Sequence, residues 1–164
     1  MAVAVGGDVL LGRWALDLTE GLVPVQVWHA VADLPASQAE AVVRRATDTV
    51  REVAVRRLRE VVAEIGAADI VGVVVGDFPV PESTRAVLAS HTLMHAAEGQ
   101  LYRDALLDAA ASLGIPGVGV PRKQAAARLA ADLADPVRAL GVTAGRPWRK
   151  EHKLAAVAAL LAAE

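Results

Sequence analysis

Three residues that can do chemistry, His91, His95 and Glu98, recur at spacings of four and three along one predicted helix. These spacings place their side chains on one helix face. Two histidines one turn apart can ligate zinc, although the His-Glu-x-x-His arrangement with its adjacent general base is absent. The group is interpreted as a metal- or phosphate-directed cluster or, alternatively, as a polar stripe with one histidine packed against the core.

Glu98 has small neighbours on both sides, in Ala96-Ala97-Glu98-Gly99. Because small side chains let another element approach closely, this carboxylate can become buried. A buried carboxylate needs a partner. The candidate partners are Lys153 and Arg103.

The segment Arg146–Lys153 is the most charge-asymmetric part of the chain, with four cations, Trp148 and His152 against one acid, Glu151. A helix N-terminus favours anions, and arginine with tryptophan can bind phosphate and stack on a base. In the alternative interpretation, Trp148 anchors the loop to the core and the cations stay in water. The candidate phosphate-binding residues are Arg149, Lys150 and Lys153, with His152 and Trp148 as secondary candidates.

Composition excludes several classes of protein. The chain has 164 residues, 54% of them hydrophobic, which suits one domain over residues 1–164 and excludes a disordered chain. The absence of cysteine excludes disulfides, thiol nucleophiles and cysteine-ligated metals. A formal charge of −2 gives no overall attraction to nucleic acid or anionic membrane. No apolar stretch reaches the roughly 18–20 residues that span a bilayer, and no secretory signal is seen, so a cytoplasmic protein is expected.

Three short strands are predicted at the start of the chain. Val3–Val5 is rich in valine, Arg13–Leu18 follows a short turn, and Val23–Val31 alternates apolar and other residues. Glu20-Gly21 is a tight-turn signal between the second and third strands. These segments predict an antiparallel meander.

Helices and buried strands alternate in the remainder. Apolar residues at spacings of three and four predict a helix over Ser37–Ile65 that Gly66 ends, or alternatively two shorter helices with a break. Asp69–Asp77 is β-branched without polar alternation, which is typical of a strand covered on both faces. The later elements are a helix over Ser83–Leu113, a strand over Ile115–Pro121, and helices over Arg122–Leu133 and Lys150–Ala163 with a loop over Gly141–Trp148.

The predicted order β-β-β-α-β-α-β-α-α indicates an α/β fold: a mixed five-stranded sheet with helices on both faces and the first and fourth strands side by side. This order resembles the ribonuclease H-like fold, which includes the RuvC-type resolvases and families of predicted nucleases. Val3–Asp8 looks like the first strand of that group and Gly12–Leu16 like the start of its second. Val73–Asp77 is similar to the fourth strand, and Trp148–Ala158 to the C-terminal helix.

The resemblance implies a nucleic-acid-processing protein, a metal-dependent nuclease that cleaves phosphodiester bonds in DNA or RNA. In that fold, carboxylates from adjacent central strands bind two Mg²⁺ or Mn²⁺ ions, one activating water and the other neutralising the leaving oxygen. It implies Asp8 and Asp77 as catalytic metal ligands, with Glu98 or Glu151 completing the set. The chain departs from the pattern at the last helix, where Lys153 stands in place of a carboxylate.

Two alternatives remain open at this stage. Asp8 and Asp77 can instead end their strands in solvent, bonded to nearby backbone groups. The chain can also be a degenerate member of the same fold, a binding or assembly module without catalytic activity or metal. Small residues in Ala109–Ala111 and Ala125–Ala127 permit close helix packing, so a homodimer is expected under this second hypothesis.

Overall fold

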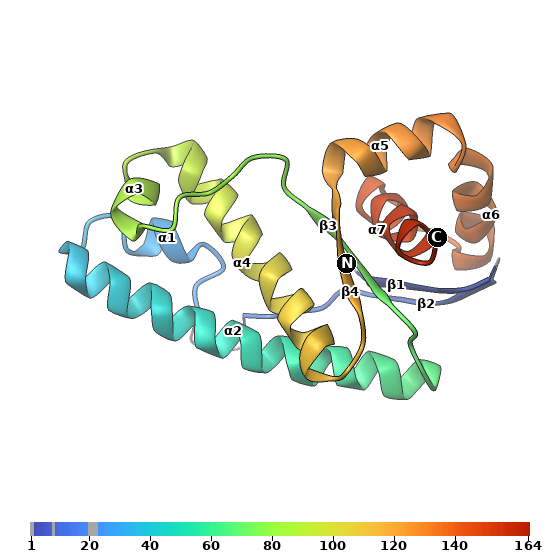
Figure 1. Ribbon diagram of the computed structural model, residues 1–164, viewed down its shortest axis with the longest axis horizontal. Helices are drawn as coiled ribbons and strands as arrows, with labels where there is room; N and C mark the ends of the chain where they lie inside the picture. Colours follow the sequence, from blue (N-terminus) through green and yellow to red (C-terminus); the bar gives the residue numbers. More distant parts are fainter. Residues whose placement is uncertain (1, 8, 20–22) are drawn as a thin grey trace.

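The computed structural model describes residues 2–7, 9–19 and 23–164. Asp8 and the turn predicted at Glu20-Gly21 therefore lie outside the described residues. The described residues form four strands and seven helices. Their order along the chain, labelled in Figure 1, is β1 (Ala2–Gly6), β2 (Val9–Trp14), α1 (Val27–Ala30), α2 (Ala36–Ile65), β3 (Val71–Val75), α3 (Thr84–Leu88), α4 (His91–Ser112), β4 (Gly117–Pro121), α5 (Arg122–Ala131), α6 (Ala134–Ala144) and α7 (Lys150–Ala162).

The four strands form two separate two-stranded sheets. β1 and β2 pair antiparallel, with a register shift between Ala4 and Val5. β3 and β4 pair parallel, with Val71 opposite Gly117 and Val75 opposite Pro121. A parallel pair needs a crossover connection, which α3 and α4 provide.

The predicted five-stranded, ribonuclease H-like sheet is therefore wrong, because β1 and β3 belong to different sheets among the described residues. The predicted third strand, Val23–Val31, contains α1 instead. Its buried residues, Val27, Trp28 and Val31, follow helical rather than alternating spacing. Pro24 also lacks the N–H that a sheet needs. The second strand is displaced as well: β2 spans Val9–Trp14, not Arg13–Leu18.

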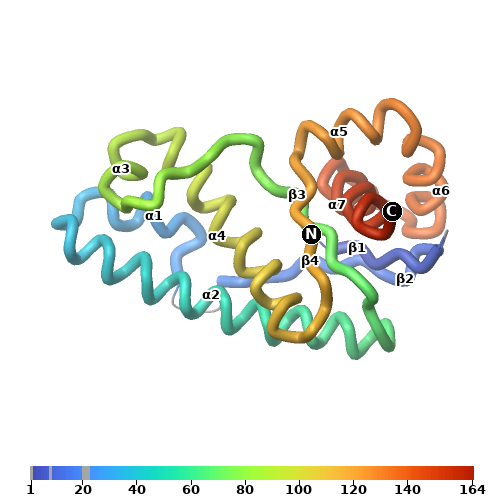
Figure 2. Tube along the Cα trace, viewed as in Figure 1, coloured from blue at the N-terminus to red at the C-terminus, as the bar shows by residue number. Residues whose placement is uncertain are grey.

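The long helix predicted over Ser37–Ile65 is confirmed as α2. Its predicted apolar face is buried through Val50, Ala54, Leu58 and Val61, and Gly66 ends it with a positive φ of 90°. Figures 1 and 2 both show α2 beside α4, with α1 and α3 at one end of the pair. These four helices enclose one hydrophobic core.

The helix predicted over Ser83–Leu113 is broken into α3 and α4. Ser90 causes the break, because its Oγ accepts a hydrogen bond from the backbone N–H of Leu93 at 3.4 Å and so caps α4. His91 becomes the first residue of α4. The loop predicted over Gly141–Trp148 is also partly wrong, since α6 continues to Ala144.

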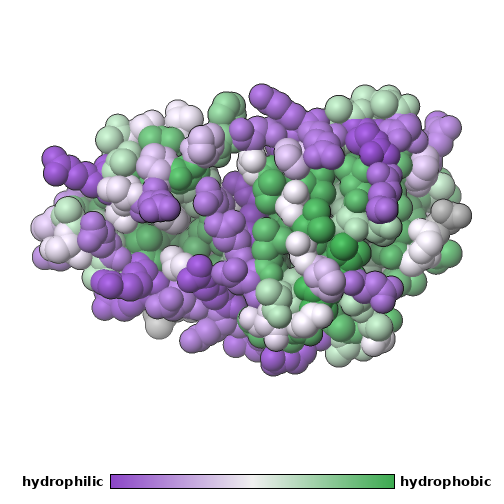
Figure 3. Space-filling view, in the orientation of Figure 1, coloured by the Kyte–Doolittle hydropathy of each residue, from purple (hydrophilic) through white to green (hydrophobic). Residues whose placement is uncertain are grey.

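The predicted strands over Asp69–Asp77 and Ile115–Pro121 are confirmed as β3 and β4, and the last helix as α7. β3 and β4 lie between the four-helix core and a second group formed by the hairpin and α5–α7 (Figure 2). Apolar side chains gather on the surface over these two strands (Figure 3), where Val118 of β4 is 39% exposed.

Helix α7 packs against both β1 and β3, and its Ala156, Val157 and Ala158 are fully buried in a second core. At the closest point, Gly72 of β3 lies against the backbone of α7. A Cβ atom on Gly72 would overlap the carbonyl oxygen of Ala158. The close approach of α7 therefore leaves room only for glycine at this position.

Replacing Gly72 with alanine is expected to lower the free energy of unfolding by roughly 1–3 kcal/mol, because the added methyl group meets backbone that cannot rotate away. Gly76→Ala is the matched control, since a Cβ there lies no closer than 3.5 Å to the Arg103 guanidinium. The control should stay within about 0.5 kcal/mol of the parent. Urea unfolding followed by circular dichroism measures both, and equal effects would contradict the packing described for α7.

Candidate metal centre

Three imidazole rings meet where α1 contacts the first two turns of α4. His29 comes from α1, and His91 and His95 come from α4. Each histidine offers a ring nitrogen, and the three nitrogens lie within 4.8 Å of one another. The ring centroids are 4.9 Å apart for His29 and His91 and 4.5 Å apart for the other two pairs. We call these three residues the histidine cluster.

Local structure fixes the position of each ring. Val27 and Trp28 are buried and anchor the four residues of α1 against α2 and α4. His29 follows them and is only partly exposed. On α4, the Ser90 cap sets the first helical residue, so His91 and His95 lie one turn apart on the same face.

Glu98, one further turn along α4, is the buried carboxylate beside the cluster, with 6% of its surface exposed. Its Oε1 lies 2.7 Å from Nδ1 of His29 and also accepts the backbone N–H of His29 at 3.4 Å. Its Oε2 lies 3.5 Å from Nδ1 of His95. A carboxylate only accepts hydrogen bonds, so Nδ1 of His29 carries a proton, and in the neutral form of this ring Nε2 holds the free lone pair.

That Nε2 atom of His29 is buried and has no hydrogen-bond partner among the described residues. Buried polar atoms are normally paired, and an unpaired one costs about 1–3 kcal/mol. A metal ion bound by Nε2 would supply the missing partner. The site is not sealed, because the side chain of His95 is 49% exposed and His91 is exposed too.

The donor set fits zinc and similar transition metals. Imidazole suits Zn²⁺, Cu²⁺, Ni²⁺ and Fe²⁺, whereas Mg²⁺ and Mn²⁺ favour oxygen ligands. The nitrogens of a tetrahedral zinc site lie roughly 3.4 Å apart, so the nitrogens of the histidine cluster, which lie within 4.8 Å of one another, would have to approach by at most about 1.4 Å to hold an ion. Three protein ligands with a fourth position open are typical of catalytic zinc, and a carboxylate behind a ligating histidine orients it.

The structure gives no support for Asp8 and Asp77 as a pair of carboxylates that binds Mg²⁺ or Mn²⁺. Asp8 lies outside the described residues, and β1 and β3 are not neighbours in a sheet. Asp77 follows β3, and its Oδ1 accepts the backbone N–H of Lys123 at 3.0 Å in the first turn of α5. Asp77 therefore satisfies a free N–H at the start of a helix, as in the alternative interpretation.

Glu98 is buried, but its partner is His29 rather than Lys153 or Arg103. Glu151 is exposed in the first turn of α7. Helix α7 belongs to the second core, whereas Glu98 lies beside the first. The structure thus joins His91, His95 and Glu98, as their spacing predicts, and adds His29.

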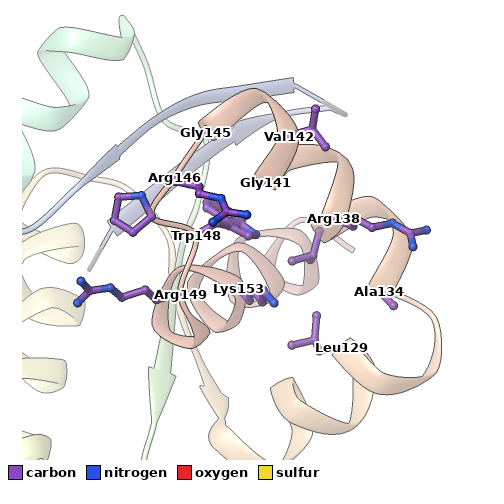
Figure 4. A pocket seen from close by; sticks show the side chains of 12 residues that line it. Leu129, Ala134, Arg138, Gly141, Val142, Gly145, Arg146, Trp148, Arg149 and Lys153 are labelled. Carbon is purple, nitrogen blue, oxygen red and sulfur yellow. The ribbon is translucent and has the colours of Figure 1, made fainter.

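Two of the three candidate phosphate-binding residues, Arg149 and Lys153, line a groove of about 990 Å³ between α5, α6 and the start of α7 (Figure 4). Arg146, Arg149 and Lys153 line it together with Arg138, whereas Lys150 is exposed outside the lining. In Figure 4 the side chains of Arg149 and Arg138 point away from each other, and Arg138 pairs with Asp135. The cations do not converge on one point.

Trp148 and His152 anchor the segment before α7. Their rings stack with centroids 5.5 Å apart, and Nδ1 of His152 accepts the backbone N–H of Arg149 at 3.0 Å. His152 is 4% exposed. Burial lowers the pKa of His152 below 6.5, and the positive charges of Arg13 and Arg149 lower it further. These contacts agree with the anchoring interpretation of Trp148.

The buried His152 makes stability depend on pH. Because its folded-state pKa lies below the unfolded value, its contribution is complete above about pH 6.5 and is lost as the pH falls toward the folded value. His152→Gln keeps an acceptor for the Arg149 N–H but does not titrate. Between pH 7.5 and pH 5.5, urea unfolding should show a larger loss of stability for the parent than for this variant. Identical slopes would contradict the neutral, buried state of His152.

Comparison with protein-family models, with curated protein sequences and with solved structures finds no match for this chain. Within the described residues, no helix is both long and apolar enough to cross a membrane.

His29 is the candidate ligand that the sequence analysis missed. It lies about sixty residues before His91, inside a segment interpreted as a strand. The available signal was the helical spacing of Val27, Trp28 and Val31, which predicts a helical turn but not its contact with α4. Only the packing of α1 on α4 brings the third imidazole to the other two.

Proposed function

We propose that this protein binds a zinc-like transition metal through His29, His91 and His95 and uses it to activate water for hydrolysis. The observation that carries the proposal is Nε2 of His29. This atom is buried, oriented by the bond from Nδ1 to Glu98, and without a partner among the described residues. His29 belongs to the one group, among the described residues, of three residues that each offer a ligand atom within 4.8 Å of the other two.

The chemistry follows from the ligand set. Three neutral imidazoles leave the charge of the metal unneutralised, and zinc in such a setting lowers the pKa of a bound water to about 7. A metal held by His29, His91 and His95 would therefore supply the activation of water at neutral pH. His91 and His95 are exposed, so a substrate can approach from their side. Glu98 acts through His29 and is a positioning residue.

Cleavage of phosphodiesters in DNA or RNA, inferred from the resemblance, stays a prediction. The groove lined by Arg146 and Lys153 lies beside α7 in the second core, away from the histidine cluster on α1 and α4 (Figure 1). It therefore gives no reason to prefer a phosphodiester over a carboxylic ester. Both substrate classes belong in the test of activity.

Zinc is expected to stabilise the folded protein. At a free concentration 100 times its dissociation constant it adds about 2.7 kcal/mol, which corresponds to a rise in Tm of roughly 5–11 °C. The double variant His91→Gln/His95→Gln should lose this rise, and Mg²⁺ should not reproduce it. His152→Gln, a histidine removed elsewhere, is the matched control and should keep the rise. Thermal unfolding by circular dichroism after chelator treatment measures each case.

Two results separate the parts of the proposal. An equal zinc effect in the parent and the double variant contradicts binding at the histidine cluster. If zinc binds there but the loaded protein hydrolyses neither p-nitrophenyl acetate nor bis(p-nitrophenyl) phosphate above the rate of zinc alone, water activation is wrong. Activity should rise through about pH 7, following ionisation of the bound water.

Glu98→Gln is expected to weaken zinc binding by about 10- to 100-fold, because it removes the charge that orients and polarises His29. The three ligands remain, so bound Co²⁺ should keep the position of its visible absorption bands. Competition with a chelator measures the affinity, and Glu52→Gln, at an exposed position on α2, is the matched control. Unchanged affinity in Glu98→Gln contradicts the positioning role.

A further inference from the structure

Apart from the histidine cluster, the protein has a cavity of about 760 Å³ between the β1–β2 hairpin, β3, α7 and the C-terminal half of α2. This volume falls in the range of about 300–1,000 Å³ that small-molecule sites occupy. The cavity occupies the space between β1 and β3, where the sequence predicts direct strand pairing. Its walls are mainly apolar and include Leu58, Val61, Ile65, Val73, Leu106 and Leu154.

Two arginines line this cavity, Arg103 of α4 and Arg122 at the start of α5. Arg103 is half-buried, and in the described part of the chain no side chain or backbone group forms a hydrogen bond or ion pair with its guanidinium. Burial lowers the pKa of Arg103; Arg122 lowers it further, whereas Asp104 and Asp77 act in the opposite direction. A partly desolvated cation without a paired carboxylate favours an incoming anion.

The arginines lie at the carboxyl ends of the two parallel strands. Gly76 follows β3, and a Cβ atom there would lie 3.5 Å from the Arg103 guanidinium. Arg122 follows Pro121, the last residue of β4. In α/β proteins the carboxyl ends of parallel strands are the edge at which ligands bind.

The acids in the same wall do not pair with Arg103. Asp17 is engaged locally, because its Oδ1 accepts both the backbone N–H and the hydroxyl of Thr19, at 2.9 and 2.6 Å. Asp69 and Glu151 are exposed, so water screens their charges. The cavity thus combines an apolar interior with an unpaired cation at one place in its wall.

We propose that this cavity binds a small amphiphilic anion: an alkyl chain inside the apolar cavity and a carboxylate or phosphate head on Arg103 and Arg122. A long-chain carboxylate and an alkyl phosphate share this chemistry. The site uses none of the three histidines. Its occupancy therefore does not depend on the proposed metal.

Calorimetric titration with dodecanoate, dodecyl phosphate and dodecan-1-ol, each below its micelle concentration and with chelator present, tests the proposal. Both anions should bind the parent, and the alcohol should bind at least about 10-fold more weakly, because it cannot form a charge-assisted hydrogen bond with a guanidinium. The tighter anion identifies the preferred head group. No binding of either anion, or equal binding of the alcohol, overturns the proposal.

Variants then locate the site. Arg103→Gln should lower the affinity for dodecanoate about 10-fold and leave that for the alcohol unchanged. Arg44→Gln makes the same change of charge at an exposed position on α2 outside the cavity, and it should bind dodecanoate like the parent. Ala155→Leu places a larger side chain in the cavity wall and should weaken binding of all three probes, with folding checked by circular dichroism.

Two patterns among the variants contradict the assignment. Equal loss in Arg103→Gln and Arg44→Gln means that overall charge, not the head-group site, sets the affinity. Unchanged binding in a folded Ala155→Leu variant places the alkyl chain elsewhere. His91→Gln/His95→Gln should bind dodecanoate like the parent, so failure of the metal site and failure of this site are distinguishable.

Discussion

The packing of α7 against two separate sheets is the constraint on which the rest of the fold depends. A two-stranded sheet is marginal in water by itself, so the β1–β2 hairpin and the β3–β4 pair each need an apolar cover. Helix α7 covers both through small buried residues, and its backbone touches Gly72 of β3. Because the sheets meet α7 without pairing with each other, an apolar cavity remains between β1 and β3.

Two charged side chains of helix α4, Glu98 and Arg103, are wholly or partly buried, and they differ in whether they have a partner. Glu98 is buried with a partner, since His29 of α1 meets its carboxylate. Arg103 is half-buried without one among the described residues. The paired carboxylate orients a ring toward its neighbours, whereas the unpaired guanidinium faces a cavity. Both proposed sites therefore originate in one helix that packs between α2 and the β3–β4 sheet.

Local sequence patterns predicted those helices and strands whose formation depends on residues close to one another in the chain. The spacing of Val50, Ala54 and Leu58 defines α2, and the β-branched run over Asp69–Asp77 defines β3. Strand pairing depends on distant segments, and the same valines in Val3–Val5 suit a two-stranded hairpin or a larger sheet. For the site, the spacing of His91, His95 and Glu98 was informative because all three share one helix. The position of His29 along the chain carried no such signal, because only tertiary packing brings α1 to α4.

His29 lies far in sequence from the two histidines of α4, so a metal bound by all three would link distant parts of the chain. The chain has no cysteine and so no disulfide. A metal held by His29 and His91 would close a loop of about sixty residues that contains all of α2 and β3. Closing loops of this size removes conformational entropy from the unfolded chain, an effect of about 4 kcal/mol for a covalent bridge. The histidine cluster would then serve as a reversible cross-link, fastening the beginning of the four-helix core to its last helix.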